Sequence, residues 1–361
     1  MTAVVAVLLL PAAPALAHGS GGSDATNFAS AVQGLATADA DRNPVGSLTD
    51  PPAVTWRVLA NDALLQVAND SGQELLVPGY DGEPYLRVGP QGVWENRNSP
   101  AVYLNADRYA QTAVPDGVSA GTDPEWVKVA DEPVHAWHDH RIHWMAATLP
   151  PQVKADPAVE TVVQDWTVPF TLDGRTLAVT GQLRWVPPPT WSPWLVAALA
   201  VTSAPLLVAL RRPAGAARRR AWLRAAAVVI AVIVVIDAVH TVDDVFAVPA
   251  TLTQNIVAFA QSAIFIVIAA FGAVKGWRGG DGAAIAVGAG GGALALGIGL
   301  THLATLTSSQ VATVLPVAFS RAVVAANLAV IVSAGTAAWF GREPLPDAPA
   351  TSGAHASGVT P

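Results

Sequence analysis

The 361-residue chain contains no cysteine and only two methionines, one of them the initiator. The lack of cysteine excludes disulfides, iron–sulfur clusters, thiolate zinc sites and cysteine nucleophiles, and the scarcity of methionine argues against a thioether-rich copper(I) site. Charged residues make up only 13% of the chain, against about 25% in soluble domains. Signatures such as G-x-S-x-G, H-E-x-x-H and the P-loop are also missing, so we do not expect an enzyme.

Basic residues are scarce in the first half of the chain. Residues 18–190 hold 21 acidic and 10 basic side chains, residues 191–361 hold 6 and 10, and the net charge is −7. The acidic half contains no basic stripe that could neutralise phosphates, and together with the negative net charge this argues against nucleic acid as a partner. The two halves differ because they face different solvents.

The first 17 residues, MTAVVAVLLLPAAPALA, are apolar and end in small residues, as in a secretory signal peptide. Residues 18–53 are rich in Gly, Ser, Ala and Asp, which predicts a flexible arm. Cleavage after residue 17 would leave His18 at the mature N-terminus. Its imidazole and the α-amine could then chelate copper(II) together; the alternative is that a histidine follows the cleavage site by chance.

Short apolar runs separated by turn residues fill 54–190, which predicts an extracytoplasmic all-β sandwich of immunoglobulin type. The expected strands include 101–105 and the whole of 134–146. Asp173 and Gly174 lie between two such runs and predict a tight hairpin.

Five apolar segments follow, at 191–210, 223–241, 254–274, 283–303 and 313–340. Each is near or above the ~20 residues that a membrane-spanning helix needs, so 191–340 is expected to form a bundle of five transmembrane helices in the plasma membrane. Of the four connecting loops, the first and the third contain Lys or Arg and the other two contain neither. Since positive loops are cytoplasmic, the β-domain is expected outside and a disordered tail, 341–361, inside.

Four histidines lie within nine residues, in HAWHDHRIHWM. On a strand, His138 and His140 would share one face and His143 the other. Two imidazoles at i and i+2 can reach one metal, and without thiolates a set of His138, His140 and His143 with a carboxylate or water would suit copper(II) or zinc. The alternative is that these residues are structural and hydrogen-bonded to their neighbours.

The second apolar segment carries Asp237, His240 and Asp244 at helical spacing, so that they share one face. The fourth ends with His302 and the fifth contains Arg321. Ionisable groups within a membrane span usually face the bundle interior with a partner. We therefore expect an Asp237–Arg321 ion pair and a metal, haem or proton site built from His240, His302 and Asp244; the alternative is a purely structural polar network.

The stretches YLRVGPQGVWENRNSPAVYLN and WHDHRIHWM, with WTVPFTLDGRTLAVTGQLRW, resemble a family of uncharacterised actinobacterial envelope proteins that have a signal peptide, a β-rich ectodomain and membrane spans. This resemblance implies the architecture and no activity. The layout and His18 are also weakly similar to periplasmic copper-handling membrane proteins, which implies copper as a ligand. The Met-rich segments of some of those proteins are missing here.

Two functions remain open on this evidence. The first is a membrane protein that binds a transition metal, copper above all, on its outer domain and hands it to, or senses it with, the helices. The second is an envelope interaction or scaffold protein whose ectodomain recognises another protein or a cell-wall component, with histidines that are structural or tune affinity with pH.

Overall fold

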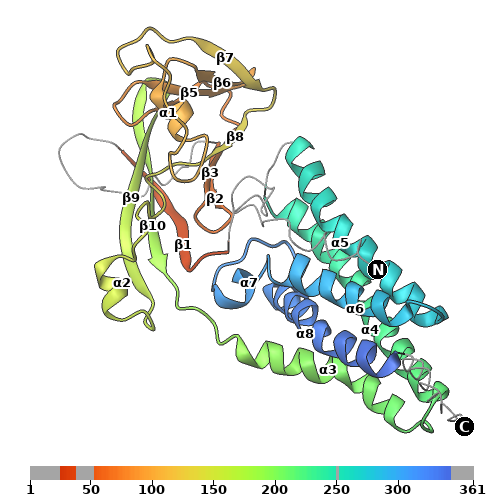
Figure 1. Cartoon of the computed structure of the whole chain (residues 1–361). Coiled ribbons are helices and arrows are strands. Elements are labelled where there is room, and N and C mark those ends of the chain that lie inside the picture. The colour runs from red at the N-terminus through yellow and green to blue at the C-terminus, as the bar shows by residue number, and fades with distance from the viewer. Residues whose placement is uncertain (1–24, 38–52, 249–251, 343–361) are drawn as a thin grey trace, which may run out of the picture.

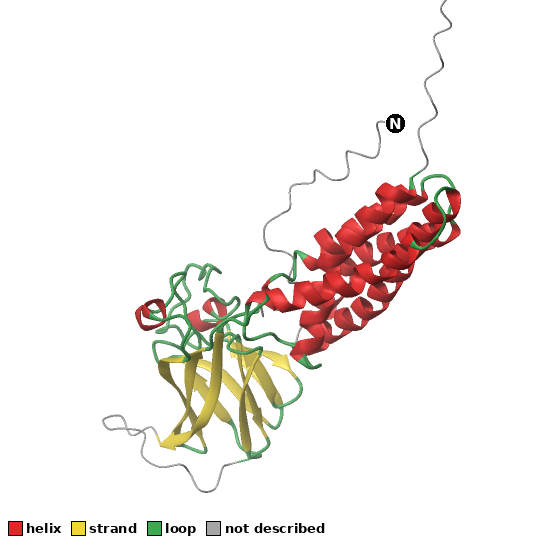
Figure 2. Cartoon of the chain, turned by 90° about the horizontal axis from the view of Figure 1, so that it is seen from below, coloured by secondary structure: helices red, strands yellow, loops and turns green. Residues whose placement is uncertain are grey.

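The computed structural model describes residues 25–37, 53–248 and 252–342. An antiparallel β region comes first, and a set of long apolar helices follows it, with the β region standing at one end of the helices (Figures 1 and 2). The predicted signal peptide, His18 and residues 343–361 of the predicted tail lie outside the described residues.

The β region contains two antiparallel sheets. The larger sheet has the strand order β1-β10-β9-β4-β5-β6-β7 and the smaller one β2-β3-β8. The two sheets of a constant-type immunoglobulin domain have four and three strands, whereas the sheets here have seven and three. The immunoglobulin-type arrangement therefore stays a prediction. The strands are β1 (Phe28–Thr37), β2 (Val54–Leu59), β3 (Leu64–Asn69), β4 (Leu75–Pro78), β5 (Pro84–Gly89), β6 (Gly92–Asn96), β7 (Trp126–Ala130), β8 (Val134–Trp137), β9 (Thr161–Leu172) and β10 (Arg175–Trp185).

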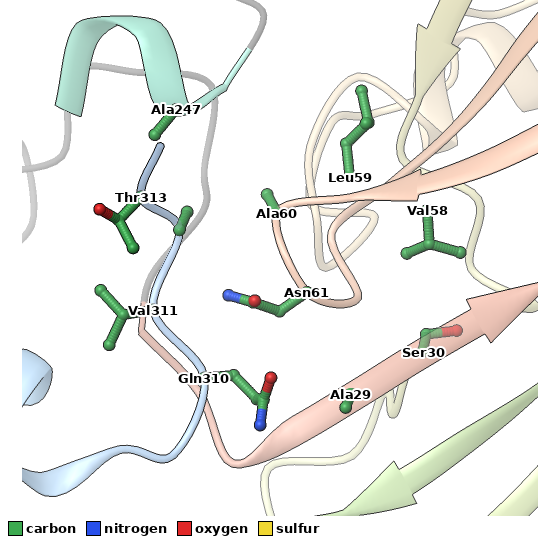
Figure 3. A pocket seen from close by; sticks show the side chains of 11 residues that line it. Ala29, Ser30, Val58, Leu59, Ala60, Asn61, Ala247, Gln310, Val311 and Thr313 are labelled. Atoms are coloured by element: carbon green, nitrogen blue, oxygen red, sulfur yellow. The ribbon is translucent and has the colours of Figure 1, made fainter. Parts of the chain in front are cut away.

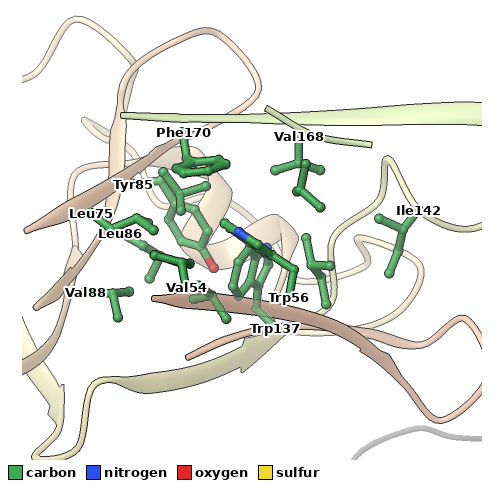
Figure 4. Packing of buried hydrophobic residues seen from close by; sticks show 14 of the residues in the cluster. Val54, Trp56, Leu75, Tyr85, Leu86, Val88, Trp137, Ile142, Val168 and Phe170 are labelled. Carbon is green, nitrogen blue, oxygen red and sulfur yellow. The ribbon is translucent and has the colours of Figure 1, made fainter. Parts of the chain in front are cut away.

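Alternating side chains of both sheets form one apolar core (Figure 4). Trp56 of β2 lies at its centre, with ring centroids 5.1 Å from Phe170 and 6.2 Å from Trp137. Edge-on and tilted aromatic pairs at such separations add to the free energy gained from burying their area. The core therefore joins β2 and β8 of the small sheet to β9 of the large one.

The predicted hairpin is confirmed. Asp173 and Gly174 connect β9 to β10 with φ values of 49° and 71°, the left-handed pair that a two-residue type I′ turn requires. This turn sets the register of the two longest neighbouring strands.

Three sequence predictions for the β region are wrong. Residues 101–104 belong to helix α1 (Pro100–Leu104), which ends at the C-cap Asn105, because Ser99 caps its N-terminus and Pro100 suits the first turn. The strand expected over 134–146 ends at Trp137. Residues 28–37 of the predicted flexible arm form β1, which pairs with β10.

Among the described residues, four helices are long and apolar enough to cross a membrane. They are α3 (Ser192–Leu210), α4 (Ala216–Ala247), α5 (Leu252–Arg278) and α8 (Val317–Gly341). The fourth predicted segment forms a shorter helix, in which α6 (Ala283–Gly292) continues into a π-helical turn, η2 (Ala293–Gly299), before the short α7 (Ala304–Thr307). Large apolar side chains remain exposed along the helices, which suits a lipid bilayer, and the count of five spans stays a prediction.

Small residues bring the helices close together, as the Gly-rich run at 288–299 suggests. A Cβ on Gly272 of α5 would lie 2.5 Å from the carbonyl oxygen of Ala286 on α6. Helix α8 packs against α3, α4 and α6, and so occupies the middle of the bundle.

The segment that precedes α8 joins the helices to the β region. The backbones of Thr26 and Gln310 exchange two hydrogen bonds, of 2.9 and 2.8 Å, next to β1. Ser309 donates to the Asn27 side chain and to the Val186 carbonyl. The β region is therefore attached to the same end of the bundle as residues 302–316.

Candidate functional site

The predicted histidines of the helical part meet one carboxylate at this end of the bundle. His240 and Asp244 lie one turn apart on α4, and the His240 Nδ1–Asp244 Oδ2 distance is 3.0 Å. His302, which follows η2, has its Nε2 3.7 Å from the same Asp244 oxygen. The two imidazole rings are 5.7 Å apart and nearly perpendicular. The four-residue spacing on α4 predicted the His240–Asp244 contact, and the packing of the helices brings His302 to the same carboxylate.

The backbone around His302 determines which of its ring nitrogens faces Asp244. Nδ1 lies 2.9 Å from the carbonyl oxygen of Ile298, which can only accept, so Nδ1 carries a proton. In neutral His302, Nε2 then presents a lone pair to the Asp244 carboxylate at 3.7 Å. Two acceptors face one another, and only a positive charge, either a second proton or a metal ion, makes this contact attractive.

The cluster is open on one side. The side chains of Asp244 and His302 retain 37% and 21% of their exposure, whereas that of His240 retains 7%. An ion can therefore approach Asp244 and His302 from the surface, with His240 as the inner wall.

One turn further from the β region, Asp237 of α4 is buried against Asn327 of α8. The Asn327 side-chain amide donates to Asp237 Oδ1 at 2.6 Å. Within the described part of the chain, three buried atoms here have no hydrogen-bond partner: Asp237 Oδ2, Asn327 Oδ1 and His240 Nε2. Unpaired buried polar atoms are rare in native proteins, and each one calls for an explanation.

The predicted Asp237–Arg321 ion pair does not form. Arg321 donates instead to the carbonyl oxygens of Thr305, Ser308 and Ser309, which belong to the segment before α8. These carbonyls follow the end of a short helix and need donors, and Arg321 lies one turn into α8, where it reaches them.

Asp243, the neighbour of Asp244 on α4, has a structural role. Its carboxylate accepts from the backbone N–H groups of Val314 and Leu315 and from the Thr313 hydroxyl. The adjacent acidic pair therefore divides its roles: Asp243 holds the 313–315 segment and Asp244 faces the histidines. The helical periodicity, 100° per residue, was the available signal for this division.

In the β region the histidine cluster lies on a loop, so the predicted sharing of strand faces is wrong. The loop begins because Asp139 accepts hydrogen bonds from Trp137 Nε1 and from the backbone of Arg141. His138 Nδ1 contacts the carbonyl of Ala63 at 2.8 Å, and His140 Nε2 contacts that of Asp107 at 3.1 Å. Each of these two histidines thus commits a ring nitrogen to the backbone of a different loop.

His143 is buried with both ring nitrogens unpaired within the described residues. Burial, with the nearby Arg108 charge, lowers the pKa of His143 to about 3, and burial lowers the pKa of His135 to about 4. Both imidazoles are therefore neutral at physiological pH.

Two buried ion pairs surround the histidine loop. Asp139 and Arg141 form a bidentate pair at 2.8 and 2.6 Å, and Asp62 accepts from Arg108 at 2.7 Å. Burial opposes ionisation of Asp139, but the hydrogen bonds and charge of Arg141 leave its pKa below the usual value. These ion pairs hold the histidine loop in a tightly packed corner of the β region. We therefore favour a structural role for its polar residues.

As they stand, no three His, Asp or Glu side chains in residues 25–37, 53–248 and 252–342 are grouped to hold a metal ion. His138 and His140 contact separate backbone carbonyls, both ring nitrogens of His143 are unpaired among the described residues, and His18 lies outside those residues. In the helical cluster, the His240–Asp244 contact is short enough for a proton rather than a metal to lie between the two groups.

An open pocket of about 390 Å³ lies between the β region and the helices (Figure 3). Its wall combines the start of β1, the β2–β3 turn with Asn61, the end of α4 at Ala247, and residues 310–313. None of the described residues that line it is charged, and none of them belongs to the His240 cluster.

No family model, curated protein or solved structure matches this chain. The resemblances to actinobacterial envelope proteins and to copper-handling proteins therefore stay predictions, and the class supported by the fold is a β-rich protein with apolar helices suited to a membrane.

Proposed function

We propose that this protein binds a divalent transition metal, copper(II) or zinc, through His240, His302 and Asp244 at the outer end of its membrane helices. The observation that supports this best is the geometry of His302: its Nδ1 contacts the Ile298 carbonyl oxygen, and its Nε2 faces the Asp244 carboxylate at 3.7 Å. A cation between them resolves the repulsion of two acceptors, and two imidazoles with one carboxylate form a ligand set typical of these metals.

The distances are close to those that coordination requires. Metal–ligand bonds of about 2.0–2.1 Å separate neighbouring ligands of a tetrahedral ion by roughly 3.3 Å. The two contacts to Asp244 Oδ2 are 3.0 and 3.7 Å, on either side of that value. A small side-chain rotation would equalise them, and water would complete the coordination.

The orientation in the membrane is part of this proposal. The arginines that flank the start of α4 support a cytoplasmic position for that end. Asp244 lies 28 residues after Ala216, the first residue of α4, or about 42 Å along the helix at about 1.5 Å per residue, whereas the hydrocarbon core is about 30 Å thick. The metal would then enter from outside, under a β region of sandwich type, and be handled or sensed by a bundle of five spans.

The test is metal titration of the full chain in lipid nanodiscs. We expect about one Cu²⁺ or Zn²⁺ to bind with nitrogen ligation, visible for copper in its electron paramagnetic resonance spectrum. His240→Ala or His302→Ala should weaken binding at least tenfold. The matched control, His140→Ala, changes a histidine of the β region and should leave binding unchanged.

Two results would overturn the proposal. In the first, wild-type protein binds neither metal at micromolar concentration. The positive charge between His302 and Asp244 would then be a second proton on His302, and the cluster would be a proton site. Binding that His140→Ala abolishes and His302→Ala preserves would move the site to the β region.

A further inference from the structure

We propose that the end of the bundle opposite the His240 cluster binds an anionic phospholipid, whose headgroup phosphate is held by Arg220 and Arg224 of α4 beside Trp277 of α5. This inference goes beyond the proposed metal site and does not depend on it. Three observations support it: the charge at this end, the contact between Arg224 and α5, and the apolar surface that continues from the two arginines.

Basic side chains gather at this end of the bundle. The Arg224–Trp277 contact and the Trp222–Phe340 ring stack place the start of α4 beside the ends of α5 and α8. In the described residues here, the one acidic side chain is Asp281, and the basic ones are Arg211, Arg212, Arg218, Arg219, Arg220, Arg224, Lys275, Arg278 and Arg342. None of these basic groups forms an ion pair with a carboxylate of residues 25–37, 53–248 or 252–342. Clustered cations at the end of membrane helices attract anionic lipid headgroups.

Arg224 is held in place where α4 meets α5. Its Nε donates to the Trp277 carbonyl oxygen at 3.3 Å, and its Cζ lies 5.5 Å from the centroid of the Trp277 ring. The helices are close together here, since a Cβ on Gly276 would lie 3.2 Å from the Leu223 carbonyl oxygen. Among the described residues, no acceptor binds the two terminal nitrogens of Arg224. The guanidinium is therefore positioned and still able to bind a phosphate, the anion whose geometry arginine matches.

The face of α4 that carries Arg224 has the layout of a phospholipid. Arg220 lies four residues earlier, so the two exposed arginines are neighbours on one face of the helix. Four and eight residues after Arg224, the same face carries Val228 and Val232, which are 45% and 56% exposed. Two cations are thus followed by an apolar surface along which an acyl chain can lie. Trp277 is 56% exposed, and its ring suits the boundary between headgroups and chains.

The same charges favour an anionic lipid over a zwitterionic one. A phosphatidylcholine headgroup would bring its quaternary ammonium group toward the arginines, and Asp281 is the one described carboxylate at this end that could attract it. Phosphatidylglycerol carries the phosphate without that cation.

The experiment is native mass spectrometry of the full chain in detergent, which resolves the binding of single lipids. We expect the first phosphatidylglycerol to bind wild-type protein at least tenfold more tightly than a phosphatidylcholine with the same acyl chains. Combining Arg220→Gln with Arg224→Gln should weaken phosphatidylglycerol binding at least tenfold, because each basic residue near an anionic headgroup contributes about fivefold. Inorganic phosphate, added at constant ionic strength, should not displace the lipid, since it cannot use the apolar surface.

The matched control combines Arg211→Gln with Arg212→Gln, which removes the same charge from the loop before α4 and should weaken binding by no more than about twofold. Equal weakening by the two double variants would overturn the site, because the attraction would then come from the general charge of this end. Displacement by phosphate would overturn the assignment to a lipid. Equal affinities of wild-type protein for the two lipids would overturn the whole inference, and that comparison needs no variant. None of these results bears on metal binding at the other end of the bundle.

Discussion

Acid should destabilise the β region through its buried neutral histidines, and His143→Leu should remove a defined part of that effect. His143 is 1% exposed, and its pKa of about 3 follows first from burial and then from the nearby Arg108 charge. In the unfolded chain its pKa returns to about 6.5. Since the unfolded state binds the proton more tightly, stability falls as pH falls below about 6.5.

The magnitude follows from these two pKa values. Between pH 7.5 and pH 5.5 the unfolded histidine becomes almost fully protonated while the folded one stays neutral, which costs about 1.4 kcal/mol. His143→Leu should therefore reduce the loss of stability over this interval by about 1.4 kcal/mol. At pH 7.5 the variant should be no less stable than wild type, because the ring nitrogens that it removes are buried without partners among the described residues.

The assay is hydrogen exchange by mass spectrometry on the full chain, following peptides that cover β8 and the loop after it. Exchange rates are corrected for their intrinsic pH dependence and converted to free energies of opening. His135→Leu serves as an independent second case, because burial also lowers the pKa of His135, to about 4. An unchanged pH dependence in both variants would refute the reasoning that burial keeps these imidazoles neutral.

Two further predictions concern the helices. Arg321→Leu should lower the amount of folded protein in membranes, because it leaves the carbonyls of Thr305, Ser308 and Ser309 without their donor. Adding Asp237→Leu should not restore it, and recovery in the double variant, measured by size-exclusion chromatography of membrane extracts, would instead support the ion pair expected from the sequence. Gly272→Ala should lower the thermal stability of the bundle, since its new Cβ would lie 2.5 Å from the Ala286 carbonyl oxygen. Gly292→Ala has no atom within 4 Å of its Cβ and should be neutral; equal melting temperatures would contradict the close α5–α6 packing.

Local chemistry explains which parts of the fold could be predicted. Asp173 and Gly174 gave the hairpin because few residue pairs adopt two successive left-handed conformations. The histidine loop could not be predicted, because it depends on a buried carboxylate, Asp139, that takes hydrogen bonds from Trp137 and Arg141. The strand at 28–37 was missed because its pairing partner, β10, lies about 150 residues further along the chain, beyond any local pattern.

The same division holds for the candidate site. Helical periodicity alone placed Asp237, His240 and Asp244 on one face of α4, because residues three and four apart are neighbours on any α-helix. His302 was expected in this cluster from its place at the outer end of the fourth apolar segment, and the structure brings it to Asp244. Only the tertiary structure decided that Asn327 and not Arg321 meets Asp237, and that Arg321 donates to backbone carbonyls. The rotation of each helix about its own axis is set by packing against its neighbours, here by close glycine contacts and a π-helical turn, and it determines which polar side chains meet.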